Sequence, residues 1–383
     1  MRLVILGLSI TSSWGNGHAT TYRALVREMA RRGHEVLFLE RDVPWYAANR
    51  DLPCPPYGRT ELYAGLADLR TRFAERVAAA DAVMLGSYVP EGVAVGRWAL
   101  ATAAGAVVFY DIDTPITLAK LGRADYEYLH PDLIPRFRMY LSFTGGPALE
   151  TLERTYGARA ARPLYCSVDP DIYFPDRKCP VAYDLGYMGT YSADRQPTLD
   201  RLLAEPARRW PEGRFAVAGP QFPPDVAWPA NVHRIDHLPP SEHRGFYCSQ
   251  RFTLNVTRRD MAAAGYSPSV RLFEAAACAT PVITDAWEGL GDFFRVGEEI
   301  LVARSAAEAL SLLRDTSEAE RIAIGRRALR RVLACHTGRR RAETLEGYLA
   351  GLEPEAADAP PERFAEAVAP EPGAAQLRRA YDY

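Results

Sequence analysis

Apolar runs alternate with amphipathic segments along the chain, and this alternation constrains the fold more than any other feature. The run LVILGLSI ends in a glycine-rich loop and is followed by a segment in which Leu25, Val26 and Met29 recur at helical spacing. The apolar runs DAVMLGS and AVVFYDID come next, each preceded by a helical segment. Strands that alternate with helices build a parallel sheet covered on both faces. The first half of the chain is therefore expected to be a Rossmann-like α/β domain.

The same alternation restarts in the second half, with VAYDLGYMG, RFAVAG, FTLNVT and TPVITD as the expected strands. A chain of 383 residues exceeds the size at which one hydrophobic core keeps growing, so two domains are expected. The prolines and aspartates of PLYCSVDPDIYFPDRKCP break the pattern and indicate a linker. The sequence predicts a domain over residues 1–165, a linker over 166–180, a second Rossmann-like domain over 181–335, a helix over 336–352 and a Pro-, Ala- and Glu-rich tail over 353–383.

Charge and cysteine content narrow the expected partners and compartment. A formal net charge of -2 gives no electrostatic reason to expect nucleic acid. Six cysteines without a CxxC pair argue against a zinc ribbon and a secreted disulfide framework, which favours the cytoplasm. The apolar amino terminus is short and runs into a polar loop, as a buried first strand does. No apolar stretch approaches membrane-spanning length.

The stretch SPSVRLFEAAACATPVITD, residues 267–285, places an arginine and a glutamate just inside an expected helix. Ser267 is expected to cap that helix and Pro268 to occupy its first position. The free amides and Arg271 would then hold a diphosphate, and Glu274 on the same face would accept the hydroxyls of a ribose. The alternative is an i,i+3 ion pair on an exposed helix face. The apolar and small residues around the pair favour a crevice.

The segment PSVRLFEAAACATPVITD resembles the nucleotide-sugar signature of GT-B glycosyltransferases, and within them the group-1-type, spore maturation protein CgeB-like family. The resemblance covers most of the second domain and the helix over 336–352. It implies two Rossmann-like domains facing a cleft, with the nucleotide-sugar on the second and the acceptor on the first. The late helix is expected to return to the first domain. In the wider retaining group a further glutamate stands eight positions before the one matched by Glu274, and this chain has Tyr266 there.

The segment GYMGTYSADRQP follows the first strand of the second domain and matches the family's loop beneath the donor phosphates. Its glycines let backbone approach a diphosphate, and Arg195 would neutralise the charge of the leaving group. The alternative is a plain turn with a solvated Arg195. The loop over 233–239 matches the segment that grips the nucleobase through backbone atoms. The predicted donor-binding residues are Gly189, Thr190, Arg195, Ser267, Ser269, Arg271 and Glu274.

The segment TSSWGNGHAT follows the first strand of the chain and is expected to face the cleft, because ligands of such folds lie at the carboxyl ends of strands. His18 is the candidate base or hydrogen-bonding partner for an acceptor hydroxyl, and Asp113 is a second candidate base. For both residues the alternative is a helix cap. The predicted catalytic residues are His18, Asp113, Arg195 and Arg271, and the predicted acceptor- or sugar-binding residues are Gly15, Gly17, His18, Trp287 and Glu288. For Trp287 and Glu288 ordinary packing is the alternative.

The sequence thus predicts a glycosyltransferase that moves a sugar from a nucleoside diphosphate to an unidentified acceptor hydroxyl, with no obligatory metal or cofactor. The resemblance favours retention of configuration, while inversion with His18 or Asp113 as base stays open. A first alternative is an NAD-dependent oxidoreductase, because GNGHAT half-matches a dinucleotide fingerprint and Glu40 follows the second strand. A second alternative is a non-catalytic nucleotide-sugar-binding or spore-coat-type protein.

Overall fold

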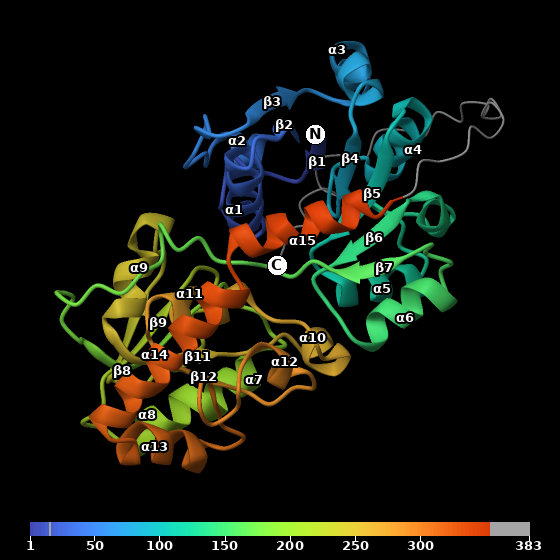
Figure 1. The fold of residues 1–383 in the computed structure, drawn as a ribbon. Helices are drawn as coiled ribbons and strands as arrows, with labels where there is room; N and C mark the ends of the chain where they lie inside the picture. Colours follow the sequence, from blue (N-terminus) through green and yellow to red (C-terminus); the bar gives the residue numbers. More distant parts are fainter. Residues whose placement is uncertain (15–16, 353–383) are drawn as a thin grey trace.

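The computed structural model describes residues 1–14 and 17–352. These residues form two lobes, each built on one β-sheet with helices packed around it (Figure 1). All strand pairings in both sheets are parallel, as the alternation of strands and helices predicted. Gly15 and the tail over 353–383 lie outside the described residues.

The first sheet has seven strands in the order β3-β2-β1-β4-β5-β6-β7. Its strands are β1 Arg2–Gly7, β2 Glu35–Arg41, β3 Arg59–Tyr63, β4 Ala82–Gly86, β5 Ala106–Asp111, β6 Met139–Ser142 and β7 Ala161–Pro163. The helices between them are α1 His18–Arg31, α2 Pro44–Ala47, α3 Leu66–Ala78, α4 Gly92–Thr102, α5 Thr114–Gly122 and α6 Pro147–Arg154, with a 3-10 helix over Pro131–Arg136.

The central strand β1 shows how the first lobe is held together. Val4 and Leu6 belong to the hydrophobic core on one face of the sheet. Leu3 and Ile5 belong to the core on the other face, and none of the four is more than 4% exposed. Because successive side chains of a strand point to opposite faces, only a continuous apolar run can fill both cores.

The second sheet has six strands in the order β10-β9-β8-β11-β12-β13. Its strands are β8 Tyr183–Met188, β9 Phe215–Ala218, β10 Val232–Ile235, β11 Gln250–Asn255, β12 Val282–Thr284 and β13 Leu301–Val302. The helices are α7 Gln196–Leu199, α8 Glu205–Arg209, α9 Pro240–Cys248, α10 Arg259–Ala264, α11 Val270–Ala277, α12 Leu290–Phe293, α13 Ala306–Asp315, α14 Glu318–Cys335 and α15 Gly338–Ala350, with a π-helical turn over Asp200–Ala204.

The helix α15 packs on the first lobe although it follows the second lobe in sequence. Ala342 and Leu345 of α15 are fully buried in the same core as Leu25 and Met29 of α1. In Figure 1 this helix, coloured red, runs from the lower end of α1 towards β6 and β7 of the first lobe, and it contacts α1. The chain therefore crosses from the first lobe to the second and back again.

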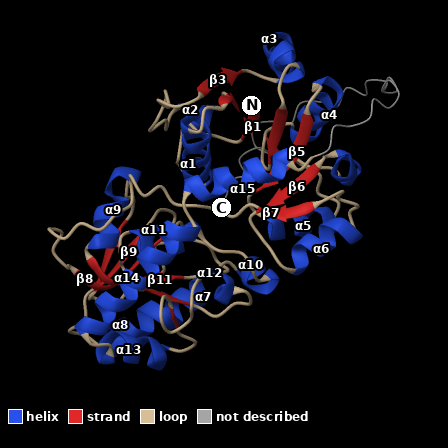
Figure 2. Ribbon diagram, in the orientation of Figure 1, coloured by secondary structure: helices blue, strands red, loops and turns tan. Residues whose placement is uncertain are grey.

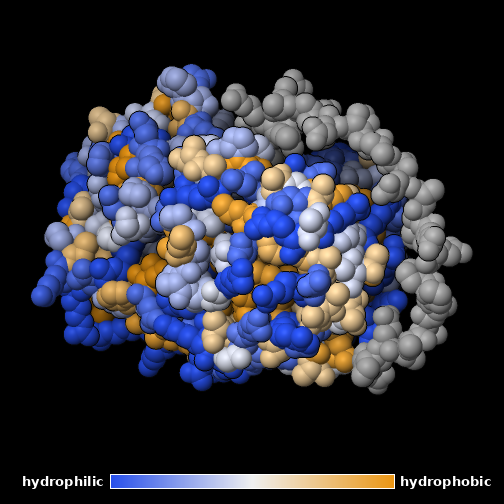
Figure 3. Space-filling view, turned by 90° about the horizontal axis from the view of Figure 1, so that it is seen from above, coloured by the Kyte–Doolittle hydropathy of each residue, from blue (hydrophilic) through white to orange (hydrophobic). Residues whose placement is uncertain are grey.

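Helices flank the strands of both sheets in Figure 2, which is the layered arrangement of α/β proteins. Seen from above, hydrophilic side chains cover most of the face, and hydrophobic ones occur in scattered groups (Figure 3). Across the described residues, no helix combines the length and the apolar character that a membrane crossing requires.

Candidate functional site

The helix α11 begins two residues later than the sequence predicted. Its N-cap is Ser269, whose hydroxyl accepts the Arg271 N–H at 3.3 Å, and its first residue is Val270. The prediction that Ser267 caps the helix and that Pro268 starts it is wrong. The Ser267 hydroxyl is buried and accepts a hydrogen bond from Thr144 Oγ1 at 3.0 Å, so it joins the two lobes instead.

The side chain of Arg271 is fixed at the carboxyl ends of two neighbouring strands. Its Nε donates to the Met188 carbonyl of β8 at 2.5 Å, and its Nη1 donates to Asn255 Oδ1 of β11 at 2.8 Å. The residue is only 8% exposed. A Cβ atom on Gly189 would lie 2.7 Å from Arg271 Nη2, so the glycine lets the backbone pass directly over the guanidinium. Ligands of parallel α/β sheets bind at this edge.

Glu274 lies one turn further along α11 and is 5% exposed. Its Oε2 accepts a hydrogen bond from Tyr247 Oη at 2.8 Å. Burial, followed by the negative charge of Glu274, raises the pKa of Tyr247 well above its usual value. Because Arg271 and Glu274 are both buried and each has another partner, the alternative of an exposed ion pair between them is wrong.

Arg195 brings a second guanidinium to the same edge. Its Nη2 donates to the Thr190 carbonyl at 2.7 Å. Its Nε is buried without a hydrogen-bond partner among the described residues. Burial lowers the pKa of Arg195, and the positive charges of Arg271 and Arg258 lower it further against the opposing influence of Tyr187. Arg195 thus lies in the positive field of Arg271 and Arg258, which the nearby Asp194 offsets in part. Guanidinium groups gathered in this way are suited to binding an anion.

The first lobe brings two predicted residues together. His18, the first residue of α1, and Asp113, which directly precedes α5, have Nε2 and Oδ2 3.5 Å apart. Their side chains are 15% and 18% exposed. His18 is not a helix cap, because the N-cap of α1 is Gly17. Asp113 does occupy the N-cap position of α5, as the capping alternative held, but its side chain makes no cap hydrogen bond to that helix. A carboxylate beside an imidazole can hold the ring in one orientation.

A buried carboxylate holds the backbone that carries Asp113. Asp111 accepts hydrogen bonds from Tyr140 Oη at 2.5 Å, from Thr117 Oγ1 at 2.9 Å and from the Asp113 N–H at 3.2 Å. Burial raises the pKa of Asp111 to about 6. Hydrogen bonds from β6 and from α5 itself therefore hold the segment between β5 and α5 and restrict where Asp113 can point.

The carboxylate of Glu40 binds the loop after β1 and is not available to bind a dinucleotide. Its carboxylate is fully buried and accepts hydrogen bonds from the Ile10 N–H at 2.7 Å, the Thr11 N–H at 3.0 Å and Thr11 Oγ1 at 2.6 Å. The prediction of Glu40 as a ribose ligand is corrected by these contacts, because they already use the oxygens that a ribose would need. The loop that Glu40 holds leads to Gly17 and His18.

The two lobes meet beside the start of α11. The Tyr266 carbonyl accepts the Gly145 N–H at 3.0 Å, and the Tyr266 N–H donates to the Glu288 carbonyl at 2.7 Å. Glu288 itself is exposed. Trp287 is 9% exposed and packs in the core, with its ring centre 5.9 Å from that of Phe293. Trp287 is therefore a packing residue, which was the alternative to sugar binding. The exposed carboxylate of Glu288 is accessible to a ligand.

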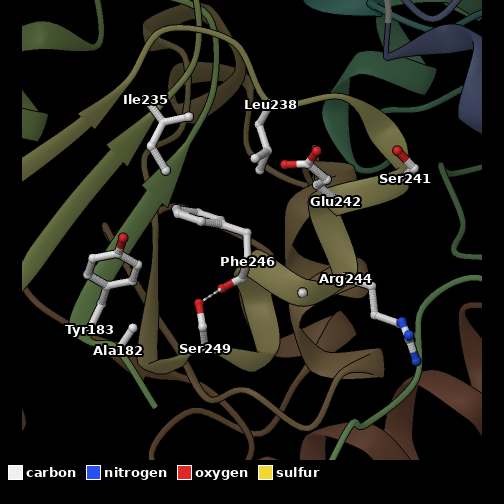
Figure 4. A pocket seen from close by; sticks show the side chains of 10 residues that line it. Ala182, Tyr183, Ile235, Leu238, Ser241, Glu242, Arg244, Phe246 and Ser249 are labelled. Atoms are coloured by element: carbon white, nitrogen blue, oxygen red, sulfur yellow. Dashed lines mark hydrogen bonds between the residues drawn. The ribbon is translucent and has the colours of Figure 1, made fainter. Parts of the chain in front are cut away.

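The hollow in Figure 4, of about 490 Å³, lies beside α9 rather than at the arginines. Its lining includes Ile235 and Leu238 from the predicted nucleobase loop, together with Phe246. The next residue, Tyr247, faces Glu274 instead. The hollow contains none of the predicted donor-binding residues, so the candidate anion site lies outside it.

Comparisons with known proteins agree with this arrangement. A family model described as glycosyl transferase-like matches residues 195–347. Sucrose-phosphate synthase from Thermosynechococcus elongatus is similar in structure, with a TM-score of 0.67, 14% identity, and coverage of 92% of this chain and 99% of that chain. HepE from Anabaena, solved in complex with UDP and glucose, has a TM-score of 0.69 at 12% identity and covers 92% of this chain and 100% of that chain. These similarities span both lobes. The chain has the GT-B fold.

The GT-B fold confirms the predicted fold class. A further GT-B structure, AviGT4, a glycosyltransferase involved in avilamycin A biosynthesis, has a TM-score of 0.58 at 15% identity and covers 92% of this chain and 98% of that chain. No curated protein matches the sequence significantly. The family match begins at Arg195 and includes Arg271 and Glu274, so it covers most of the predicted donor residues.

Sequence reasoning missed three residues that the GT-B fold brings to this edge. Asn255 holds Arg271, Tyr247 holds Glu274, and Arg258 adds a third positive charge. A signal was present for two of them, because Asn255 and Arg258 come at or just after the end of the buried strand β11. Polar residues in that position face the ligand edge of a parallel sheet. Tyr247, inside a helix, gave no such signal.

Proposed function

We propose that this protein transfers a glycosyl group from a nucleoside-diphosphate sugar to the hydroxyl of an acceptor. The arrangement of Arg195, Arg258 and Arg271 carries the proposal, because it concentrates positive charge at the carboxyl ends of β8 and β11. Breaking the glycosidic bond leaves a diphosphate whose negative charge must be stabilised. Preorganised guanidinium groups in a partly buried site supply that stabilisation.

The donor is proposed to lie along the start of α11. Ser269 caps this helix, and Gly189 and Thr190 form the loop that passes over Arg271 and binds Arg195. Glu274 is proposed to accept the ribose hydroxyls, with Tyr247 fixing its second oxygen. HepE has been solved with UDP-glucose, and the structurally similar alpha-glucosyltransferase with UDP, which supports a uridine donor as the first one to test.

The acceptor is proposed to bind on the first lobe at His18 and Asp113. The helix α5, which follows Asp113, contacts α10, which follows Arg258, and this contact between the lobes supports a position of the acceptor site near the donor site. Retention of configuration is the outcome that the resemblance implies. The close pairing of His18 with Asp113 favours inversion as the second form of the proposal, since an oriented histidine can remove a proton from the acceptor hydroxyl.

The finer parts of the proposal concern metal, compartment and family. Positive charge from arginine makes a metal ion unnecessary for holding the diphosphate, so activity is expected to survive a chelator. All six cysteines are free, which supports a reducing compartment such as the cytoplasm. Membership of the CgeB-like family and the domain boundaries at residues 165 and 180 stay predictions.

A binding and turnover experiment tests the proposal. UDP, GDP, dTDP and their sugar conjugates are titrated calorimetrically, and release of the nucleoside diphosphate is followed with acceptor mixtures. We expect one diphosphate series to bind, and Arg195→Gln to weaken its affinity by about 10- to 100-fold through loss of charge-assisted hydrogen bonds. Arg201→Gln is the matched control, because Arg201 is exposed and, within the described part of the chain, its side chain bonds the Thr198 hydroxyl alone. Binding without turnover would support a non-catalytic protein, and absence of binding would reject the proposal.

A further inference from the structure

Tyr266 has a backbone conformation that a bulky side chain rarely adopts. Its φ is 49°, in the left-handed region that favours glycine. Residues held in this region concentrate at functional sites, where the surrounding structure fixes them. Backbone hydrogen bonds hold Tyr266 in this conformation. Its N–H donates to the Glu288 carbonyl of the second lobe, and its carbonyl accepts the Gly145 N–H of the first lobe.

The ring of Tyr266 fits between two glycines from different lobes. A Cβ atom added to Gly146 of the first lobe or to Gly289 of the second would lie 2.3 Å from a ring carbon of Tyr266. Both glycines also have positive φ values, of 58° and 82°. The two glycines therefore restrict the position of the tyrosine ring at the contact between the lobes.

The hydroxyl at the end of this ring is directed to the carboxylate of Glu288. Tyr266 Oη donates to Glu288 Oε1 at 3.5 Å. The charge of Glu288, more than any other influence, raises the pKa of Tyr266. Glu288 is exposed and lies in the loop that follows β12, at the same edge of the sheet as Arg271. Three residues separate Tyr266 from the first residue of α11.

We propose that Tyr266 positions the Glu288 carboxylate to accept hydrogen bonds from the hydroxyl groups of the donor sugar. A fixed carboxylate suits this role, because it offers two acceptor oxygens to neighbouring hydroxyls. Its place beside the start of α11 puts it next to the diphosphate site, where the sugar of a nucleoside-diphosphate sugar must lie. The inference rests on the proposed function and adds to it the residue that distinguishes the sugar from the nucleotide.

Comparing a nucleotide with its sugar conjugate tests this role. Calorimetry is done with UDP and UDP-glucose, GDP and GDP-mannose, and dTDP and dTDP-glucose, using the pair that the unmodified protein binds best. We expect Glu288→Gln to lower the affinity for the sugar conjugate about 10-fold and to leave that for the free diphosphate within about twofold. Tyr266→Phe, which keeps the ring between the glycines, is expected to lower only the sugar-conjugate affinity, by about threefold. Glu298→Gln, at an exposed glutamate near Arg295, is the control.

Each outcome separates this inference from the proposed function. If no diphosphate binds, the proposed function fails and the inference fails with it. If a diphosphate binds but Glu288→Gln leaves both affinities unchanged, or lowers them equally, the proposed function stands and the role of Glu288 is rejected. An unchanged melting temperature in both variants shows that a loss of affinity does not come from unfolding.

Discussion

His18 Nε2 and Asp113 Oδ2 lie 3.5 Å apart, although the two residues follow different strands of the first sheet. Each was a separate candidate in the sequence, and the fold makes them neighbours. A carboxylate at this distance sets the orientation of the imidazole, so the two side chains act as one unit. Removing either one is then expected to cost nearly as much as removing both.

The first prediction concerns turnover. His18→Ala and Asp113→Asn are each expected to lower kcat by about 10²-fold or more, which is the usual contribution of a positioned acid or base. The double variant is expected to be little worse than His18→Ala. Donor affinity is expected to stay within about twofold, because the arginines lie on the other lobe. His130→Ala, at a histidine paired with Asp132, serves as control. Additive losses would show that the two residues act separately.

A second prediction concerns the ribose. Glu274→Gln is expected to weaken binding of the preferred nucleoside diphosphate by about 10-fold, since a charged acceptor is lost. The same variant should bind the 2′,3′-dideoxy diphosphate as well as the unmodified protein does. Tyr247→Phe, which keeps the carboxylate of Glu274, separates loss of its partner from loss of the charge. Equal weakening of both nucleotides by Glu274→Gln would remove this residue from the ribose.

A third prediction concerns the loop over Arg271. Gly189→Ala would place a Cβ atom 2.7 Å from Arg271 Nη2 and 2.7 Å from Tyr187 Oη, so either the loop or the guanidinium must move. We expect diphosphate affinity to fall at least about 10-fold and the melting temperature to fall as well. Gly347→Ala is the matched control, because no atom of residues 1–14 or 17–352 would crowd a Cβ there within 4 Å and alanine favours the helix α15. Unchanged affinity in Gly189→Ala would contradict the placement of Arg271.

A fourth prediction uses the pH dependence of folding. Burial raises the pKa of Asp111 from 3.8 to about 6, so the folded protein binds this proton more tightly than the unfolded chain does. The resulting stability is present below about pH 4 and is lost as the pH rises through 6, a change of roughly 3 kcal/mol. Asp111→Asn cannot lose a proton there. We therefore expect the free energy of unfolding of Asp111→Asn, measured in urea and taken relative to that of the unmodified protein, to rise by roughly 3 kcal/mol between pH 4 and pH 7.

The control for this measurement is Asp236→Asn, whose side chain is 97% exposed. It should follow the unmodified protein at every pH, since water surrounds this side chain in both the folded and the unfolded chain. A constant difference between Asp111→Asn and the unmodified protein across the range would show that Asp111 does not titrate as burial demands.

Most strands of the two sheets could be predicted because the central strands are buried on both faces. Strands such as β1 and β4 read as nearly continuous apolar runs. The strands β3, β6 and β7 gave no such signal. β3 is a half-exposed edge strand, β7 has three residues including a proline, and β6 has four residues. Edge strands and very short strands carry too little hydrophobic pattern to be recognised.

The candidate site was predictable only where its residues are close together in the sequence. Arg271 and Glu274 share one short helix, so their spacing already placed them together. The contact of Tyr266 with Glu288 depends on which loops the fold brings together, and that information is not in either segment. The start of α11 was misplaced for the same reason, since Ser267 satisfies a partner on the other lobe rather than its own helix.

The position of α15 also bears on how the molecule is made. Leu25 and Met29 pack against Ala342 and Leu345, so this surface of the first lobe stays uncovered until nearly the whole chain has left the ribosome. A fragment ending at the linker would expose that apolar surface to solvent. Expression of the amino-terminal half alone is therefore expected to give aggregated material, and a soluble version would need α15 fused back to it.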